Sequence, residues 1–161
     1  VPGNKDMSAK ELRARINEIY KPYQYALGDC LQGFLDRGDA PFLLSIHSFT
    51  PEMDGHKRPW EIGILWTEED RAAPPMLHAL QKNNPGLTIG DTAPYSLKLH
   101  GGRDYSNTVE SQARSRGIPS LVVEFRQDMV DTPEKAVKMA DIFLESFLEV
   151  MRDEDLYRLR A

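Results

Sequence analysis

The alternation of apolar and polar residues along the chain predicts strands separated by helices. Short apolar runs, rich in branched side chains and bounded by proline or glycine, predict strands at residues 42–46, 61–66, 87–90 and 119–126. Apolar residues at helical spacing predict helices at 8–38, 70–83, 107–116 and 132–151. Strands that alternate with helices favour a three-layer α/β/α sandwich around a mixed, mainly parallel sheet.

Capping and helix-breaking residues mark the ends of these helices. Ser8 and Glu11 have the spacing of a capping box, and Pro22 should kink or split the long first helix near Tyr20. Gly38 is a typical stop. The residues expected to face the core are Cys30 in the first helix and Val137, Ala140, Leu144, Phe147, Leu148 and Met151 in the last.

Length and composition indicate one soluble domain that covers residues 1–161, which is long enough to bury a sizeable core. The 20 basic and 25 acidic residues give a net charge of −5, which argues against nucleic acid as the main partner. The sequence contains neither a signal pattern nor an apolar run near the roughly 20 residues that span a membrane. We therefore expect a cytoplasmic protein without a membrane partner, and the sequence leaves its oligomeric state open.

Two strand ends carry side chains suited to chemistry. His47 follows the run at 42–46, and Glu124 lies near the end of the run at 119–126. Ligands collect at the carboxyl ends of strands in open α/β sheets, so we expect both side chains to face one cleft there. A histidine can bind zinc or move a proton, but it can also be structural. A buried glutamate is costly unless it is functional or paired, here with Arg126 or Arg58.

Several sequence blocks, in order and at matching spacing, resemble the N-formylglutamate amidohydrolase (N-formylglutamate deformylase) family. They are residues 1–4, 20–23, 46–49, 58–63, 90–91 with 94–96, and 123–128. The resemblance implies a zinc-dependent amidohydrolase with a fold similar to zinc exopeptidases, carboxypeptidases and aspartoacylases. It implies hydrolysis of an N-formyl or N-acyl amide of an acidic amino acid, such as N-formylglutamate to formate and glutamate, a reaction associated with histidine degradation. The partner would then be a small-molecule N-acyl amino acid.

The resemblance also assigns the central roles. It implies that His47 is a Zn²⁺ ligand and that Glu124 is the general base acting on zinc-bound water. Catalytic zinc normally has three protein ligands, so we expect the remaining ligands upstream of Val1, in an N-terminal segment of the family that this chain would lack. The chain as given should then bind zinc poorly.

Candidates for substrate recognition follow from the chemistry of individual side chains. Arg58 and Arg126 are candidates for holding a substrate carboxylate, because a guanidinium offers a planar fork of donors. Ser48 and Tyr95 are further candidates for substrate binding. The family often has a histidine where this chain has Gln112.

The remaining histidines do not match a zinc position of the family and are expected at the surface; they are His56, His78 and His100.

A second hypothesis stays open, because this chain would lack the expected upstream zinc ligands. The chain could be a non-catalytic relative or fragment that keeps the fold and binds a small anionic ligand or protein partner.

Overall fold

The computed structural model describes residues 4–66, 70–95 and 107–160. The chain divides into two compact units, Val1–Pro41 and Phe42–Ala161. The expectation of one domain over residues 1–161 stays a prediction.

The first unit is helical, and its helix is interrupted just before Pro22, as that proline predicts. Helix α1 (Ala9–Arg15) begins with the expected capping box, in which the Glu11 amide donates to Ser8 Oγ at 3.2 Å and the Ser8 amide donates to Glu11 Oε2 at 2.9 Å. A π-helical turn, η2 (Ile16–Tyr20), joins it to α2 (Lys21–Leu35). Because Pro22 has no amide hydrogen, the α-helical ladder cannot continue unchanged at this point, and the irregular turn accommodates the gap.

The prediction that Cys30 faces the core is wrong, because its side chain is exposed. The buried positions of α2 are Gln24, Gly28 and Leu31, which lie along one line of the helix. At about 100° per residue, Cys30 is roughly 200° around the helix from Gly28. Leu31 belongs to the apolar pattern and is buried, whereas Cys30 belongs to the same pattern and is exposed.

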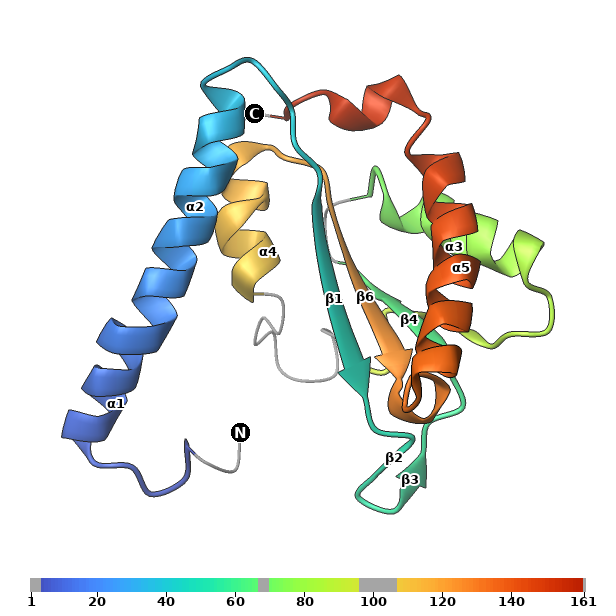
Figure 1. Cartoon of the computed structure of the whole chain (residues 1–161), viewed down its shortest axis with the longest axis horizontal. Coiled ribbons are helices and arrows are strands. Elements are labelled where there is room, and N and C mark those ends of the chain that lie inside the picture. The colour runs from blue at the N-terminus through green and yellow to red at the C-terminus, as the bar shows by residue number, and fades with distance from the viewer. Residues whose placement is uncertain (1–3, 67–69, 96–106, 161) are drawn as a thin grey trace. The chain divides into compact units, whose positions relative to one another are not determined.

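The second unit contains the sheet (Figure 1). Its strands are β1 (Leu43–Phe49), β4 (Ile62–Leu65), β5 (Ile89–Asp91) and β6 (Ser120–Arg126), in the spatial order β1-β6-β4-β5. The β1–β6 and β4–β5 pairs are parallel and the β4–β6 pair is antiparallel, which confirms the predicted mixed, mainly parallel sheet. A small separate hairpin, β2 (Glu52–Met53) and β3 (His56–Lys57), was not predicted.

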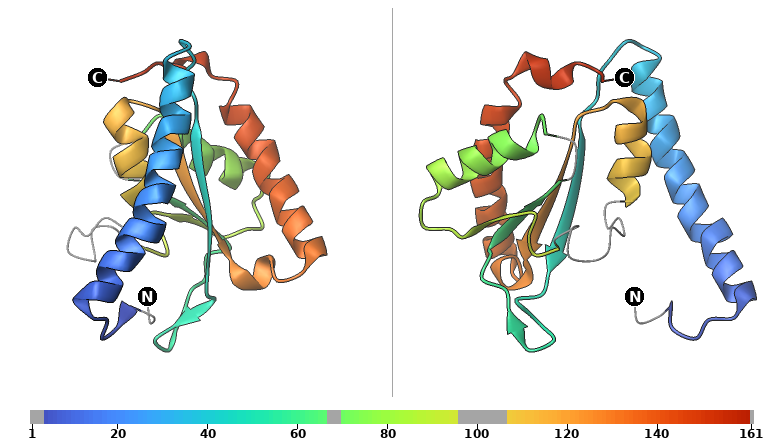
Figure 2. Two further views of the ribbon diagram at one scale, coloured as in Figure 1. Left: turned by 60° about the vertical axis from the view of Figure 1, so that its left-hand side comes forward. Right: turned by 180° about the vertical axis from the view of Figure 1, so that it is seen from behind.

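Helices lie on both faces of this sheet, as two views show (Figure 2). Helices α3 (Ala73–Asn83) and α5 (Pro133–Val150) cover one face, and α4 (Asn107–Gln112), followed by the 3₁₀ turn η3 (Arg114–Arg116), lies on the other. Two further 3₁₀ turns are η4 (Gln127–Met129) and η5 (Glu154–Tyr157). The core under α3 and α5 includes Ile62, Ile64, Met76, Leu80, Leu121, Val123, Phe125, Met139 and Phe143.

Helix α5 turns a different face to this core from the one predicted. Its buried residues are Met139, Phe143, Ser146 and Val150. Ala140, Val137, Leu144 and Leu148 are exposed, while Phe147 and Met151 are only partly buried at the edge of the core. Apolar residues surround much of this helix, so the pattern alone does not select a face. A polar tertiary contact helps to select it, since Ser146 Oγ accepts a hydrogen bond from Asn83 Nδ2 at 3.3 Å.

Strand β1 is longer than the apolar run predicted, because it continues through His47 and Ser48 to Phe49. Each residue of β1 pairs with a residue of β6, from Leu43 opposite Ser120 to Phe49 opposite Arg126. Strand alternation therefore decides which way each of these side chains points.

No helix within the described residues has the length and apolar character needed to cross a membrane.

Gly117 ends the 3₁₀ turn η3 and contacts the C-terminal segment. Its φ of 66° is left-handed, and its carbonyl oxygen accepts hydrogen bonds from the Arg160 amide at 3.1 Å and from Arg71 Nη2 at 3.2 Å. A Cβ added at Gly117 would overlap the backbone of Arg160. This position therefore requires glycine both for its conformation and for the close approach of the tail.

We predict that Gly117→Ala lowers the free energy of unfolding by at least about 1–2 kcal/mol, the usual cost of left-handed backbone for a residue with a side chain. Displacement of the Arg160 segment should add to this loss. Urea unfolding measures it, with Gly86→Ala as the control, because a Cβ at Gly86 meets nothing within 4 Å and its φ is not left-handed. Equal stability of the two variants would contradict the prediction.

Candidate functional site

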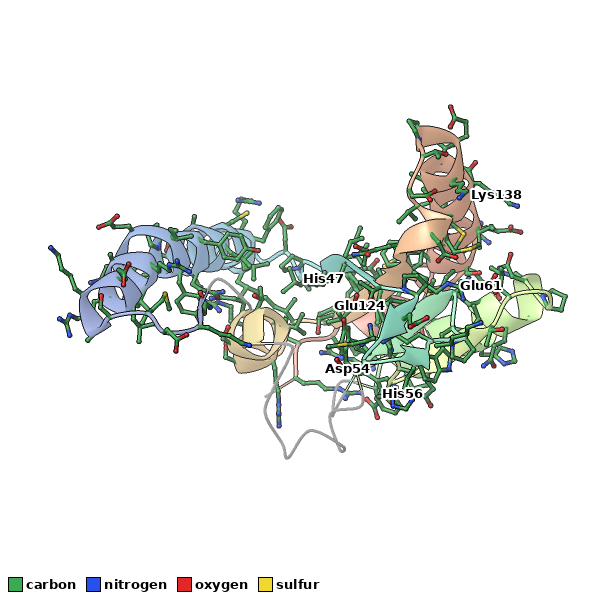
Figure 3. All side chains as sticks on the ribbon, turned by 90° about the horizontal axis from the view of Figure 1, so that it is seen from below. His47, Asp54, His56, Glu61, Glu124 and Lys138 are labelled. Atoms are coloured by element: carbon green, nitrogen blue, oxygen red, sulfur yellow. The ribbon has the colours of Figure 1, made fainter. Side chains whose placement is uncertain are left out.

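One register row crosses all four strands of the sheet and carries two of the predicted site residues, His47 and Glu124. His47 of β1 is paired with Glu124 of β6, Glu124 with Gly63 of β4, and Gly63 with Gly90 of β5. Paired residues point to the same face of a sheet, and neighbouring strands are about 4.8 Å apart. His47 and Glu124 therefore lie next to each other on the face opposite the α3–α5 core, as Figure 3 shows.

Glu124 is buried, with 7% of its surface exposed. Its Oε2 atom is buried and has no hydrogen-bond partner among the residues that the structure describes. Burial raises the pKa of Glu124 from its ordinary value of 4.5 to about 7, although the positive charge of Arg58 opposes the shift. A buried carboxyl group with an unpartnered oxygen and a raised pKa is characteristic of sites that bind a ligand or transfer a proton.

The alternative structural explanation for Glu124 was an ion pair with Arg126 or Arg58. Within the described part of the chain, Glu124 forms neither pair. Arg58 affects the carboxyl group only through its charge, and Arg126 is paired with Asp128. The structural explanation is therefore wrong, and the burial of Glu124 is left without a compensating partner inside the described residues.

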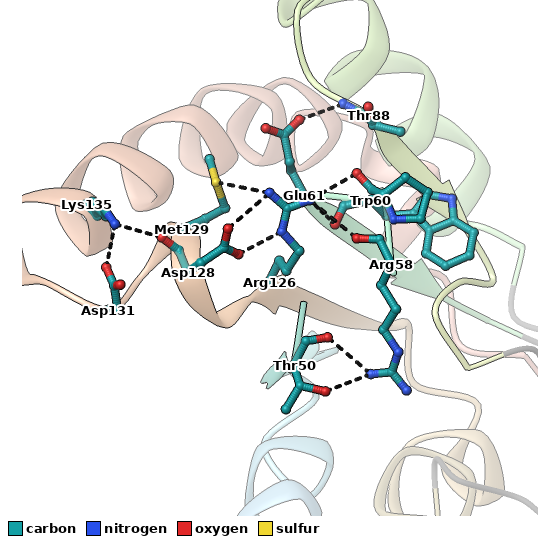
Figure 4. A network of polar contacts seen from close by, with 11 residues as sticks. Thr50, Arg58, Trp60, Glu61, Thr88, Arg126, Asp128, Met129, Asp131 and Lys135 are labelled. Carbon is teal, nitrogen blue, oxygen red and sulfur yellow. Dashed lines mark hydrogen bonds and ion pairs between the residues drawn. The ribbon is translucent and has the colours of Figure 1, made fainter. Parts of the chain in front are cut away.

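Arg126 is the centre of a separate network at the end of β6 (Figure 4). Its Nε and Nη2 donate to the two carboxylate oxygens of Asp128 at 2.7 and 3.2 Å, and its Nη1 donates to the carbonyl oxygen of Pro59 at 3.1 Å. The guanidinium holds the pKa of Asp128 below its usual range. These contacts tie the segment before β4 to the end of β6. They give Arg126 structural contacts, and its substrate-binding role stays a prediction.

Arg58 has a different environment, between two aromatic rings. Its guanidinium carbon lies 4.9 Å from the centre of the Tyr95 ring and 5.8 Å from the centre of the Phe49 ring. Its Nη1 also donates to Tyr95 Oη at 3.3 Å and, over a longer 3.5 Å, to Thr50. The rings hold this cation half-buried and near enough to Glu124 to lower that group's pKa. Arg58 thus links Tyr95, which it contacts directly, with Glu124, whose pKa its charge lowers.

His47 and Ser48 are separated by strand alternation. His47 is exposed on the Glu124 face, where its Nε2 is hydrogen-bonded to Ser45 Oγ at 2.9 Å. Ser48 is paired with Phe125, whose ring packs against Phe143 in the core on the opposite face. The structure therefore separates Ser48 from the other predicted site residues, because β1 does not end at residue 46.

The two other histidines that the structure describes, His56 and His78, lie away from this row. His56 is exposed in the β2–β3 hairpin and His78 is exposed on α3, so both surface predictions are confirmed (Figure 3 labels His56). His100 lies outside the described residues. Gln112 is buried and accepts a hydrogen bond from Arg116 Nη1 at 3.0 Å.

The described residues do not by themselves fit a catalytic zinc ion. No group of three His, Cys, Asp or Glu side chains that could hold a metal occurs within the described ranges, whereas three protein ligands are usual. His47 offers one imidazole, and the neighbouring Glu124 is the carboxyl group expected to act as a base. The expected upstream ligands stay a prediction, and no reaction step below is assigned to a metal.

Sequence reasoning missed the two glycines of the row and the aromatic support of Arg58. A glycine inside a strand often marks the close approach of another backbone, and both Gly63 and Gly90 lie in or beside apolar strand patterns. That signal was available in the sequence. The partners of the glycines were not, because Trp60, Ala93 and Pro94 reach them only through the folded chain.

The fold is that of an α/β protein, and one face of its sheet carries a buried carboxyl group and a half-buried cation, features typical of binding and acid–base sites. The family is shown by the sequence match. Residues 1–130 match the N-formylglutamate amidohydrolase family, and the chain belongs to that family.

Two solved structures are similar to this chain. A gene product of Agrobacterium tumefaciens has a TM-score of 0.85 and 26% sequence identity over 94% of this chain and 58% of its own. An N-formylglutamate amidohydrolase from Ralstonia eutropha has a TM-score of 0.62 and 16% identity over 92% of this chain and 56% of its own, which shows a common fold. The present chain thus spans less than two thirds of either protein. The comparison with curated proteins found no match.

The raised pKa of Glu124 predicts a pH-dependent stability. The folded chain keeps this proton up to about pH 7, whereas an unfolded chain loses it near 4.5. Burial of Glu124 therefore costs little stability below pH 4.5, and the cost develops as the pH rises to 7, reaching on the order of 3 kcal/mol. We predict that Glu124→Gln is more stable than the native chain at pH 8, with a much smaller difference at pH 5. Urea unfolding of both proteins at both pH values measures this, and a pH-independent difference would contradict it.

The network around Arg126 predicts a structural effect. We expect Arg126→Gln to lower the free energy of unfolding by about 2–3 kcal/mol, because charge-assisted hydrogen bonds are lost and acceptors are left unpaired. Arg158→Gln is the matched control. Arg158 forms an ion pair with Asp155, and their side chains are 80% and 70% exposed respectively, so this pair should contribute less than about 1 kcal/mol. Thermal or urea unfolding distinguishes the two, and equal losses would show that the Arg126 network adds nothing special.

Proposed function

We propose that this protein is an amidohydrolase that cleaves an N-formyl or N-acyl amide of an acidic amino acid, such as N-formylglutamate, to give formate and glutamate. The observation that carries the proposal is Glu124, a buried carboxyl group with an unpartnered oxygen and a pKa of about 7. Membership of the N-formylglutamate amidohydrolase family supplies the reaction class. The identity of the substrate rests on that family alone.

Glu124 is suited to move a proton in this reaction. At neutral pH a carboxyl group with this pKa is present in both its charged and its protonated forms, which favours general acid–base catalysis. As water attacks the amide carbonyl carbon, Glu124 takes a proton from the water and a C–O bond forms. When the C–N bond breaks, Glu124 returns the proton to the leaving nitrogen.

Arg58 and Tyr95 are proposed to recognise the carboxylate of the substrate. The guanidinium is held by the Tyr95 ring and hydroxyl and is close enough to affect Glu124 electrostatically. A substrate anion beside Arg58 would have its amide within reach of the row that contains Glu124. Arg126 is left out of the proposal, because Asp128 and backbone carbonyl oxygens occupy its guanidinium.

His47 is proposed as one ligand of a zinc ion, as the family resemblance implies. Its exposed imidazole lies beside Glu124, and neutral imidazole is a common zinc ligand. A bound zinc ion would polarise the amide carbonyl and lower the pKa of water. Metal analysis of the native protein and of His47→Ala tests this ligand role independently of turnover.

The test of the catalytic proposal is Glu124→Gln, with release of glutamate from N-formylglutamate as the assay. We expect kcat to fall by about 10²–10⁴-fold with little change in KM, because a general base acts in the transition state. Glu52→Gln is the control, since Glu52 is exposed in the hairpin.

Unchanged kcat in a folded Glu124→Gln protein would remove Glu124 from the mechanism. A native protein that binds N-formylglutamate without turning it over would instead support the alternative hypothesis of a binding protein. Calorimetric titration with N-formylglutamate separates this result from loss of binding.

A further inference from the structure

Two of the four residues in the register row of Glu124 are glycines, which have no side chain. Gly63 is the partner of Glu124 in β4, and Gly90 is the partner of Gly63 in β5. Glycine weakens a strand, since it adds backbone entropy to the unfolded chain and has no side chain to pack. Two paired glycines next to a buried carboxyl group therefore need a specific reason.

The space above these glycines is filled by a neighbouring part of the chain. A Cβ added at Gly63 would overlap the carbonyl oxygen of Ala93 and lie 3.2 Å from Pro94 Cδ. A Cβ at Gly90 would lie 3.0 Å from both Ala93 Cβ and Trp60 Cδ1. The segment after β5 thus lies directly on the sheet, in van der Waals contact with the glycine row.

Two hydrogen bonds hold the start of this segment. The Thr92 amide donates to the Ile64 carbonyl oxygen at 2.8 Å, and Trp66 Nε1 donates to Asp91 Oδ1 at 2.8 Å. From there the chain runs over Gly63 to Tyr95, whose ring and hydroxyl contact Arg58. The same short segment therefore reaches from the glycine row to the cation of the site.

We propose that Gly63 and Gly90 are positioning residues. These two paired glycines, here called the seat, support the segment Ala93–Tyr95. The segment then excludes water from Glu124 and aligns Tyr95 with Arg58. Among the described residues, the charged and titratable groups of this face include His47 from β1, Arg126 two residues after Glu124 in β6, Arg58 before β4 and Tyr95 from the segment itself. The inference rests on the proposed function only where it assigns Glu124 and Arg58 to the reaction. The contact between the segment and the sheet does not depend on that function.

The experiment measures the pKa of Glu124 directly, by NMR titration of the full chain with ¹³C-labelled glutamate carboxyl groups. The signal of Glu124 is assigned by its loss in Glu124→Gln. We expect Gly63→Ala to lift the segment and to lower this pKa by one unit or more, from about 7 toward 4.5, because water then reaches the carboxyl group. Gly86→Ala is the matched control and should leave the titration unchanged, since a Cβ there meets nothing within 4 Å.

A second variant keeps the test decisive if Gly63→Ala does not fold. Pro94→Gly removes the ring that contacts Gly63 and loosens the segment without adding an atom to the sheet, and it should lower the pKa of Glu124 in the same direction. An unchanged titration in a folded Gly63→Ala protein, or in Pro94→Gly if only that variant folds, would overturn the inference.

The readout also separates this inference from the proposed function. If Glu124→Gln keeps full activity, the catalytic role fails, but the titration of Glu124 still decides whether the segment shields it. If Glu124→Gln is inactive and the Gly63 and Pro94 variants titrate normally, the catalytic role stands and the seat does not. A shift in the variants together with an inactive Glu124→Gln supports both.

Discussion

The burial of one carboxyl group is the constraint on which the polar face of the sheet depends. Glu124 lies in the middle of β6, between β1 and β4, and a charge in that position loses most of its hydration. The described chain does not offset this cost with an ion pair or a hydrogen bond to Oε2. The group responds by holding its proton up to about pH 7, and Arg58 limits the shift. The buried group therefore lowers the stability of the folded chain above neutral pH, and its pKa lies near 7.

The opposite face of the same strands allows this cost. Val123 and Phe125, the neighbours of Glu124 along β6, point into the core under α3 and α5. The Phe125 and Phe143 rings meet edge to face with centroids 5.8 Å apart, a favoured aromatic geometry. Strand alternation thus gives β6 one stabilising face and one face on which a costly residue is tolerated.

Two arginines near the site show how similar residues acquire different roles. Arg126 pairs through two nitrogens with Asp128, which fixes the end of β6. Arg58 lies over the Tyr95 ring and near Glu124. The sequence offered both as substrate-binding candidates, because a guanidinium has the same donors in either position. Only the folded contacts show which donors are already occupied.

The sequence by itself determined the order of the main strands and helices, the capped start of α1, and the location of His47 and Glu124 at or near the ends of two strand-forming runs, because each depends on neighbours along the chain. The tertiary structure decided which face of α5 is buried, which partner Arg126 takes, and that Gly63 and Gly90 lie beside Glu124 under another segment. These features could not be read from local patterns, since they depend on strand register and on contacts between residues far apart in the sequence. A shift of register by one residue would move every side chain of a strand to the other face.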